Sequence, residues 1–245
     1  MIRFQFGRDD PENEKVSFPE CGLSPASEGS MKPLMHEQNR LDFFSGQRIS
    51  YETVISPVQS HSQTVYFAEH SASGVSRNPE ADGIITGNAT LVPCITVADC
   101  VPIYLFDPVS LCFGVLHSGW KGTGIIRSAV ELAAEKMNSR AENFYVLLGP
   151  HIRSCCYTVD PERADYFSRA FGPSCISPVP GNDQVYRLSL AEANRNLCLS
   201  LGILSVRITD TGLCTSCDTR FGSYRRQGKL SFTPMAAFIR RQEDS

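Results

Sequence analysis

The sequence predicts an α/β (α+β) fold in which helices pack on a mixed β-sheet. Short β-branched and aromatic runs cluster between residues 64 and 117, and an amphipathic helical pattern follows them. Strand-like and helix-like segments then alternate as far as residue 210. Neither an internal repeat nor a linker of biased composition interrupts the chain, so residues 1–245 are expected to form a single domain.

The predicted strands begin after an uninformative N-terminal region. Residues 1–45 mix charges, prolines and serines with little periodicity, which favours loops and short strands at the surface. Strand-like runs then read "RISYETVIS", "TVYF", "GIIT", "CITVA", "VPIYLF" and "LCFGVLH". The turn-forming residues "DPVS" separate the last two, which predicts a β-hairpin.

The helices follow in the second half of the chain. In "GWKGTGIIRSAVELAAEKMNSR", Ile126, Val130, Ala133 and Met137 recur at helical spacing. "NFYVLLGP" has the composition of a buried strand, and Pro161 suits the first position of a helix in "PERADYFSRAF". "LSLAEANRNLCLSLGI" predicts another helix, which ends near Gly202, and "VRITD" predicts a further strand.

Composition narrows the class of partner. With 23 Lys and Arg against 26 Asp and Glu, the net charge is −3, which disfavours nucleic acid and anionic lipid as partners. The N-terminus lacks an apolar leader, and no apolar run approaches the ~18 residues of a membrane span, so we expect a cytoplasmic protein. Its ten cysteines then suit packing, metal binding or nucleophilic chemistry better than disulfides. Small molecules are the expected partners, and the oligomeric state stays open.

A candidate metal site emerges from the hairpin. His117 ends its second strand and Cys100 directly precedes its first, so pairing of the strands would bring the two side chains together. His61 or His70 could add a third ligand, and spacing does not choose between them. Two histidines and a thiolate suit a catalytic zinc ion with an open fourth position, and they also suit copper.

Several separated motifs resemble those of the YfiH-type family, also called laccase-domain or polyphenol-oxidase-like proteins. They are "QSHSQTV", "EADGIIT", "TVADCVPIYLFDP", "GVLHSGWKGTG", "LGPHIRSCCYTVD" and "CTSCDTRFGSYRRQG", which together cover about residues 57–228. The resemblance implies a YfiH-like fold. It also places the family's zinc ligands on His61, Cys100 and His117.

The resemblance further implies purine nucleoside phosphorolysis. Adenosine, inosine, guanosine or methylthioadenosine would react with phosphate to give the base and a sugar 1-phosphate, with adenosine deamination as a side activity. Asp99 could hold a neighbouring donor or a ligand histidine in its working tautomer, or serve simply as a turn or cap residue.

The expected phosphate contacts lie in two motifs. "GWKGTG" offers Lys121 and the backbone N–H groups around Gly122 at a helix N-terminus. Arg225 and Arg226 could form a bidentate clamp, although adjacent arginines are often a solvated face and glycines can simply shape a turn. Trp120 could stack a base, but packing in the core is the favoured interpretation.

Two other functions stay open. A copper-dependent polyphenol oxidase is disfavoured because the chain has five histidines and no His-x-His pair. A non-catalytic zinc-stabilised binding protein would need a fourth ligand, which the Cys155–Cys156 or Cys214–Cys217 pair could supply, and both pairs also invite a redox function. The chain departs from the family pattern in three places, which leaves the nucleoside preference open. The N-terminal S-T-R-x-G-G-V-S element is absent, F-F-S-Y-R-R is replaced by F-G-S-Y-R-R, and the following T-G-R is missing.

Overall fold

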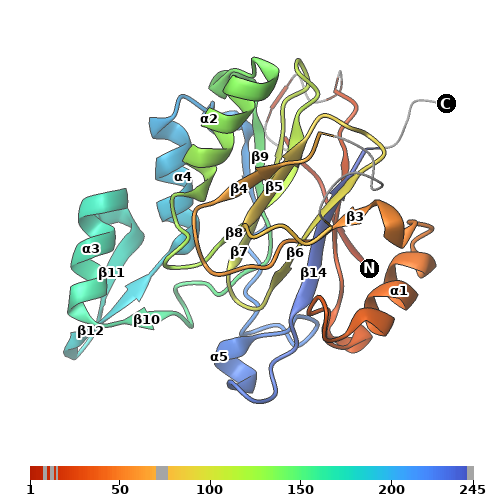
Figure 1. Cartoon of the computed structure of the whole chain (residues 1–245). Coiled ribbons are helices and arrows are strands. Elements are labelled where there is room, and N and C mark those ends of the chain that lie inside the picture. Colours follow the sequence, from red (N-terminus) through yellow and green to blue (C-terminus); the bar gives the residue numbers. More distant parts are fainter. Residues whose placement is uncertain (8–9, 12–13, 15, 70–76, 242–245) are drawn as a thin grey trace.

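Two β-sheets lie face to face in the computed structural model, and helices cover the outer face of the larger one (Figure 1). The structure describes residues 1–7, 10–11, 14, 16–69 and 77–241. The six-stranded sheet runs in the order β13 (Ile208–Asp210), β9 (Tyr145–Leu148), β7 (Val101–Phe106), β8 (Phe113–Ser118), β5 (Gly83–Thr86), β4 (Val65–Phe67). The five-stranded sheet runs β1 (Ile2–Phe4), β2 (Glu20–Leu23), β14 (Met235–Arg240), β6 (Val92–Val97), β3 (Val54–Ile55).

The predicted hairpin forms the centre of the six-stranded sheet. β7 and β8 pair antiparallel, with Pro102 opposite His117. Alternate residues of β7 serve two cores: Tyr104 packs between the two sheets, whereas Ile103 and Leu105 pack beneath the helices. A strand that is apolar along its whole length is expected where both of its faces are buried. The mixed α/β fold predicted from the sequence is therefore confirmed.

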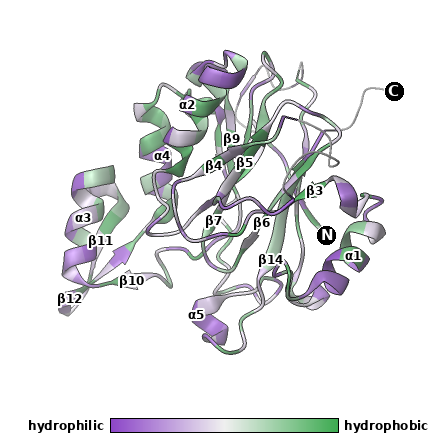
Figure 2. Ribbon diagram, in the orientation of Figure 1, coloured by the Kyte–Doolittle hydropathy of each residue, from purple (hydrophilic) through white to green (hydrophobic). Residues whose placement is uncertain are grey.

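The three predicted helices begin and end close to the predicted positions, as α2 (Ile125–Met137), α3 (Pro161–Phe171) and α4 (Leu190–Ser200). α1 (Glu37–Gly46) and the short α5 (Tyr224–Gln227) were not predicted. Pro161 opens α3 after Asp160, whose carboxylate accepts a hydrogen bond from the Arg163 amide at 2.8 Å. α2 and α4 turn apolar faces to the sheet, while α3 and α5 carry many hydrophilic residues (Figure 2).

Three segments differ from the sequence-based expectation. Residues 37–46 form a helix, and Phe4, Leu23 and Phe44 are buried, so the prediction of surface loops and strands for residues 1–45 is wrong there. No element was predicted for β14, yet it lies at the centre of the five-stranded sheet. β10 (Thr158–Val159), β12 (Asn182–Leu188) and β11 (Ile176–Val179) form a third small sheet that was also missed. β14 pairs with β2 and β6, which lie far away in the chain. β11 and β12 form a local hairpin, but only Leu188 of these two strands is buried, so they lack an apolar alternation.

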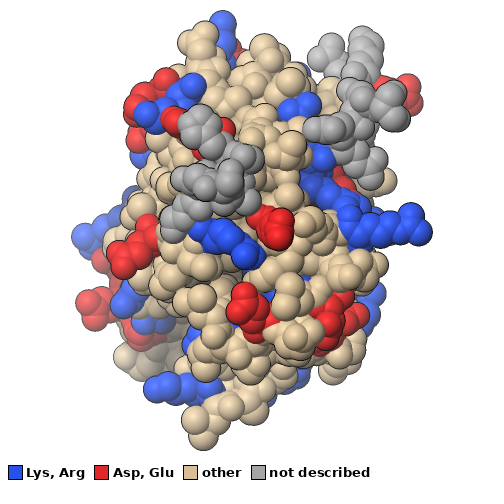
Figure 3. All heavy atoms as spheres, turned by 45° about the vertical axis from the view of Figure 1, so that its right-hand side comes forward, with Lys and Arg blue, Asp and Glu red and all other residues tan. Residues whose placement is uncertain are grey.

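The surface carries mixed charge. On the face shown in Figure 3, Lys and Arg side chains lie interspersed with Asp and Glu side chains, in keeping with the small net charge. Within the described part of the chain, every helix is too short or too polar to cross a membrane.

Candidate metal centre

Three predicted ligands converge at one end of the central hairpin. The ligand atoms of His61, Cys100 and His117 all lie within 4.8 Å of one another. His117 belongs to β8 and is 3% exposed, Cys100 directly precedes β7, and His61 lies in the loop before β4. The two imidazole centroids are 4.8 Å apart, at 71° to each other. The alternative ligand His70 lies outside the described residues.

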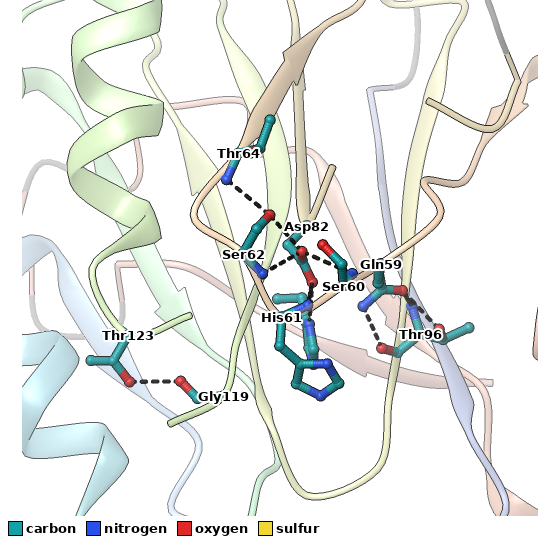
Figure 4. A network of polar contacts seen from close by, with 10 residues as sticks. Gln59, Ser60, His61, Ser62, Thr64, Asp82, Thr96, Gly119 and Thr123 are labelled. Carbon is teal, nitrogen blue, oxygen red and sulfur yellow. Dashed lines mark hydrogen bonds and ion pairs between the residues drawn. The ribbon is translucent and has the colours of Figure 1, made fainter. Parts of the chain in front are cut away.

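Asp82 holds two of these residues in place. Its buried carboxylate bonds His117 Nδ1 at 2.8 Å and accepts hydrogen bonds from the backbone amides of Ser60, His61 and Ser62 at 3.1, 3.0 and 2.7 Å (Figure 4). These amides stabilise the loop although His61 has a φ of +63°, a conformation that costs a non-glycine residue energy. With Nδ1 bonded to Asp82, the other ring nitrogen of His117 is available to a metal.

The site favours charged forms of its side chains. Burial raises the pKa of Cys100, but His117 and His61 outweigh this effect and lower it to about 6. Burial lowers the pKa of His117, but Cys100 and Asp82 raise it to about 9. Burial also raises the pKa of Asp82, yet hydrogen bonds from His117 and Ser62 hold it well below its usual range. At neutral pH the metal-free site therefore holds a thiolate beside an imidazolium.

The donor set and its surroundings fit a metal ion. Among the described residues, the group comprises two imidazoles and one thiolate, which leaves one position of a tetrahedral ion for water or substrate. Gly119 lies against the thiolate: a Cβ added there would come within 2.7 Å of Cys100 Sγ and 3.5 Å of the His61 ring. The same donors also suit copper, so this is a candidate metal site at which the donor types do not select the metal.

Metal affinity should depend on pH with a defined slope. Binding requires a neutral His117 and a Cys100 thiolate, and between about pH 6 and 9 it is His117, of these two groups, that must release a proton. We therefore expect the Zn²⁺ association constant to rise about tenfold per pH unit across this window, to rise more steeply below it and to level off above it. Competition with a chromophoric chelator measures the slope. A flat profile from pH 6.5 to 8.5 would contradict the assigned charges.

Gly119 should be intolerant of any side chain. In Gly119→Ala, the new methyl group must displace Cys100 Sγ, so we expect Zn²⁺ affinity to fall at least about tenfold. Gly181→Ala is a useful control because a Cβ there meets nothing within 4 Å, although its φ of +77° also disfavours alanine. Equal affinities in the two variants would show that the space beside the thiolate is not required.

Asp99 lies next to the thiolate but faces another loop. Its carboxylate accepts hydrogen bonds from the Thr215 hydroxyl and the Arg225 backbone amide, both at 2.6 Å. Its φ of +81° gives it the geometry of a turn residue. Asp99 therefore ties the ligand loop to the segment before α5, and the carboxylate on His117 comes from Asp82. The motif "EADGIIT" contained the signal for Asp82, an aspartate directly before a buried strand.

The glycine-rich loop packs closely around the start of α2. A Cβ at Gly122 would lie 3.1 Å from two carbonyl oxygens, and Gly124, at φ +122°, lies against the amide of Gln63. Lys121 is exposed, with its Nζ 5.3 Å from the centroid of the Trp120 ring. Trp120 is 39% exposed, so the prediction that it packs in the core is wrong.

The two arginines of "SYRR" have different surroundings. Arg226 donates to the carbonyl oxygens of Thr215, at 2.6 Å, and Phe221, so its guanidinium holds the loop before α5 together. Arg225 is exposed and donates to the Cys156 carbonyl at 3.0 Å. Arg226 therefore uses both of its Nη atoms for backbone carbonyl oxygens, whereas Arg225 donates from Nη1.

Two residues near the candidate ligands, Tyr157 and Arg163, were not singled out from the sequence. The Arg163 guanidinium lies 4.2 Å from the centroid of the Trp120 ring. The pKa of Tyr157 is raised, mainly by burial and also by the charge of Cys100, while Arg163 and Arg225 act in the opposite direction. Tyr157 therefore interacts electrostatically with Cys100 and with both arginines. The Arg225 guanidinium is also 5.5 Å from the Tyr157 ring. A cationic and aromatic rim therefore lies near Cys100.

One departure from the family motif has a structural counterpart. Gly222 occupies the position of the second phenylalanine in F-F-S-Y-R-R, and a Cβ there would lie 1.8 Å from the Thr233 carbonyl oxygen. The Gly222 amide also donates to Met235 Sδ at 3.1 Å. The segment before β14 thus occupies space that a side chain at this position would need.

Comparisons with known proteins agree with these observations. Purine nucleoside phosphorylase YlmD of Geobacillus stearothermophilus is 35% identical over 171 residues, which cover 68% of this chain and 62% of that protein. Adenosine deaminase RL5, from an unknown prokaryotic organism, is 27% identical over 192 residues, 74% of this chain and 72% of that protein. The sequence match thus spans less than two thirds of the length of YlmD.

Solved structures show the same fold over nearly the whole chain. The crystal structure of Bacillus licheniformis hypothetical protein YfiH has a TM-score of 0.81 at 29% identity, covering 95% of both chains. That of YlmD from Geobacillus stearothermophilus has a TM-score of 0.82, also at 29% identity, covering 93% of both. A family model described as "Multi-copper polyphenol oxidoreductase laccase" matches residues 30–242. The chain therefore belongs to this laccase-like family and shares its fold with the solved structures of YfiH and YlmD.

Proposed function

We propose that this protein is a zinc-dependent purine nucleoside phosphorylase acting on adenosine, inosine, guanosine or methylthioadenosine, with adenosine deamination as a second activity. The observation that carries the proposal is the convergence of His61, Cys100 and His117, with Asp82 on His117. The names of YlmD and RL5 support the two activities. Zinc with three protein ligands supplies Lewis acidity and lowers the pKa of water.

The rim near Cys100 offers groups for both substrates. Lys121, Arg163 and Arg225 would hold phosphate through charge-assisted hydrogen bonds, and Trp120 or Tyr157 would stack on the purine. In phosphorolysis the bond from C1′ to the base nitrogen breaks, a C1′–O bond to phosphate forms, and the base nitrogen receives a proton. Gly122 and Arg226 would contribute indirectly, by shaping the loops that present Lys121 and Arg225.

Product analysis tests the proposal. Protein of known metal content is incubated with each nucleoside, with and without phosphate, and bases and sugar 1-phosphates are separated by chromatography. We expect free base only with phosphate, and phosphate-independent inosine from adenosine. Absence of both products with all four nucleosides, despite a bound metal, would contradict the proposal and favour the non-catalytic zinc protein.

Copper-dependent polyphenol oxidation is the second candidate, and the description of the family favours it. The two histidines and one thiolate would suit a single copper ion. Of the remaining histidines in the described part of the chain, His36 precedes α1 and His151 bonds the Gly149 carbonyl. Oxygen consumption with a phenol, by copper-loaded but not zinc-loaded protein, would support this candidate.

A further inference from the structure

Four cysteines from two distant segments meet at the surface. Cys155 and Cys156 follow β9, and Cys214 and Cys217 precede α5. All four Sγ atoms lie within 4.8 Å of one another. Cys217 Sγ is 3.3 Å from that of Cys156 and 3.7 Å from that of Cys155. Each pair alone is weak evidence of a metal site, but the fold brings them together.

Packing does not explain this group. Cys21, Cys94, Cys112, Cys175 and Cys198 are buried, as expected of cysteines that act as small apolar residues. Cys155 and Cys217, by contrast, are exposed, and Cys156 and Cys214 are partly so. Exposed thiols gain little from mutual contact, so their convergence calls for another cause.

The sulfur positions suit a tetrahedral ion. With Zn–S bonds of about 2.3 Å, the thiolates of a tetrathiolate zinc site lie roughly 3.8 Å apart. The Sγ atoms of Cys155, Cys156 and Cys217 are 3.3–3.7 Å apart, close to this value, and Cys214 Sγ lies within 4.8 Å of all three. In addition, the Arg153 amide points at Cys214 Sγ, 3.5 Å away, as amides do around metal-bound thiolates.

We propose that Cys155, Cys156, Cys214 and Cys217 bind a second Zn²⁺ ion in a closed site, separate from the His61–Cys100–His117 centre. Four protein ligands leave no position for substrate, so this ion stabilises structure. The proposal does not depend on the activity proposed above.

The second ion would fix loops that reach the first site. It joins the segment after β9 to the segment before α5, and Arg225 bonds the carbonyl of Cys156 itself. Thr215, between the two cysteines of the second pair, donates to Asp99, the neighbour of Cys100. Loss of the ion should therefore disorder the support of Arg225 and Asp99 while leaving the three ligands of the first site intact.

Counting metal tests the proposal. The full chain is produced in zinc-supplemented medium, purified under reducing conditions and examined by native mass spectrometry and elemental analysis. We expect two Zn²⁺ per chain. The matched variants Cys100→Ala and Cys155→Ser/Cys217→Ser should each keep one, and Cys198→Ala, which removes a buried thiol outside both sites, should keep two.

A second measurement on the unmodified chain covers the case in which the double variant fails to fold. After exchange with Co²⁺, a tetrathiolate site gives intense visible bands and strong sulfur-to-cobalt charge transfer, beyond that of one thiolate. A single zinc per chain that Cys100→Ala removes would overturn the proposal. In that case thiol titration would find the four cysteines free, or the intact mass would be lower by two hydrogens for each disulfide. Iron or copper at the four cysteines would overturn the assignment to zinc.

Discussion

Cys100→Ala is expected to abolish stoichiometric metal at the His–Cys–His site and to lower the proposed phosphorolysis at least about a thousandfold. The substitution removes the one thiolate of the site and leaves two histidines, one of them exposed, as the only protein ligands. Two neutral ligands hold zinc far more weakly than two histidines and a thiolate. Elemental analysis and initial rates of base release, measured on the same preparation, check both effects.

Cys112→Ala is the matched control, because Cys112 belongs to the same hairpin. Burial and, to a smaller extent, the charge of Asp107 raise the pKa of Cys112 to about 12, whereas the pKa of Cys100 is lowered to about 6. Cys112 is buried and belongs to neither group of candidate ligands among the described residues, so its removal should cost stability alone, about 1 kcal/mol. A Cys100→Ala protein that kept full activity would exclude this site as the catalytic centre.

Asp82→Asn is expected to weaken Zn²⁺ binding by about 10–100-fold and to destabilise the metal-free protein by about 2–3 kcal/mol. The carboxylate only accepts hydrogen bonds, from three amides and one hydroxyl, while also orienting His117. An asparagine NH₂ group must face some of these donors, so buried amides lose their acceptor. Chelator competition and urea unfolding measure the two effects separately.

Asp107→Asn is the control that distinguishes an effect on the orientation of His117 from a general loss of folding stability. Asp107 is likewise fully buried and accepts from the amides of Val109 and Ser110 and from the Ser110 hydroxyl, in the turn between β7 and β8. We expect a similar loss of stability with unchanged Zn²⁺ affinity. Equal losses of affinity in both variants would contradict a specific role for Asp82.

Local patterns were sufficient for much of this fold. The apolar runs of β7 and β8, the turn between them and the helical spacing in α2 are contained in short stretches of chain, and each is found as predicted. The placement of Cys100 beside His117 follows from the register of one hairpin. Motif resemblance then selected His61 over His70, which spacing alone left open.

Other features depended on contacts between distant segments. Asp82 becomes a partner of His117 because β5 and β8 are neighbours, and Arg163 reaches Trp120 from a helix that begins 41 residues later in the chain. The four cysteines form one group because the loops after β9 and before α5 meet. Residue types and short-range spacing thus predicted Cys100 and His117 as candidate ligands, and motif resemblance added His61. Tertiary structure decided what supports them, since side chains from separate elements meet only after the sheets and helices have packed.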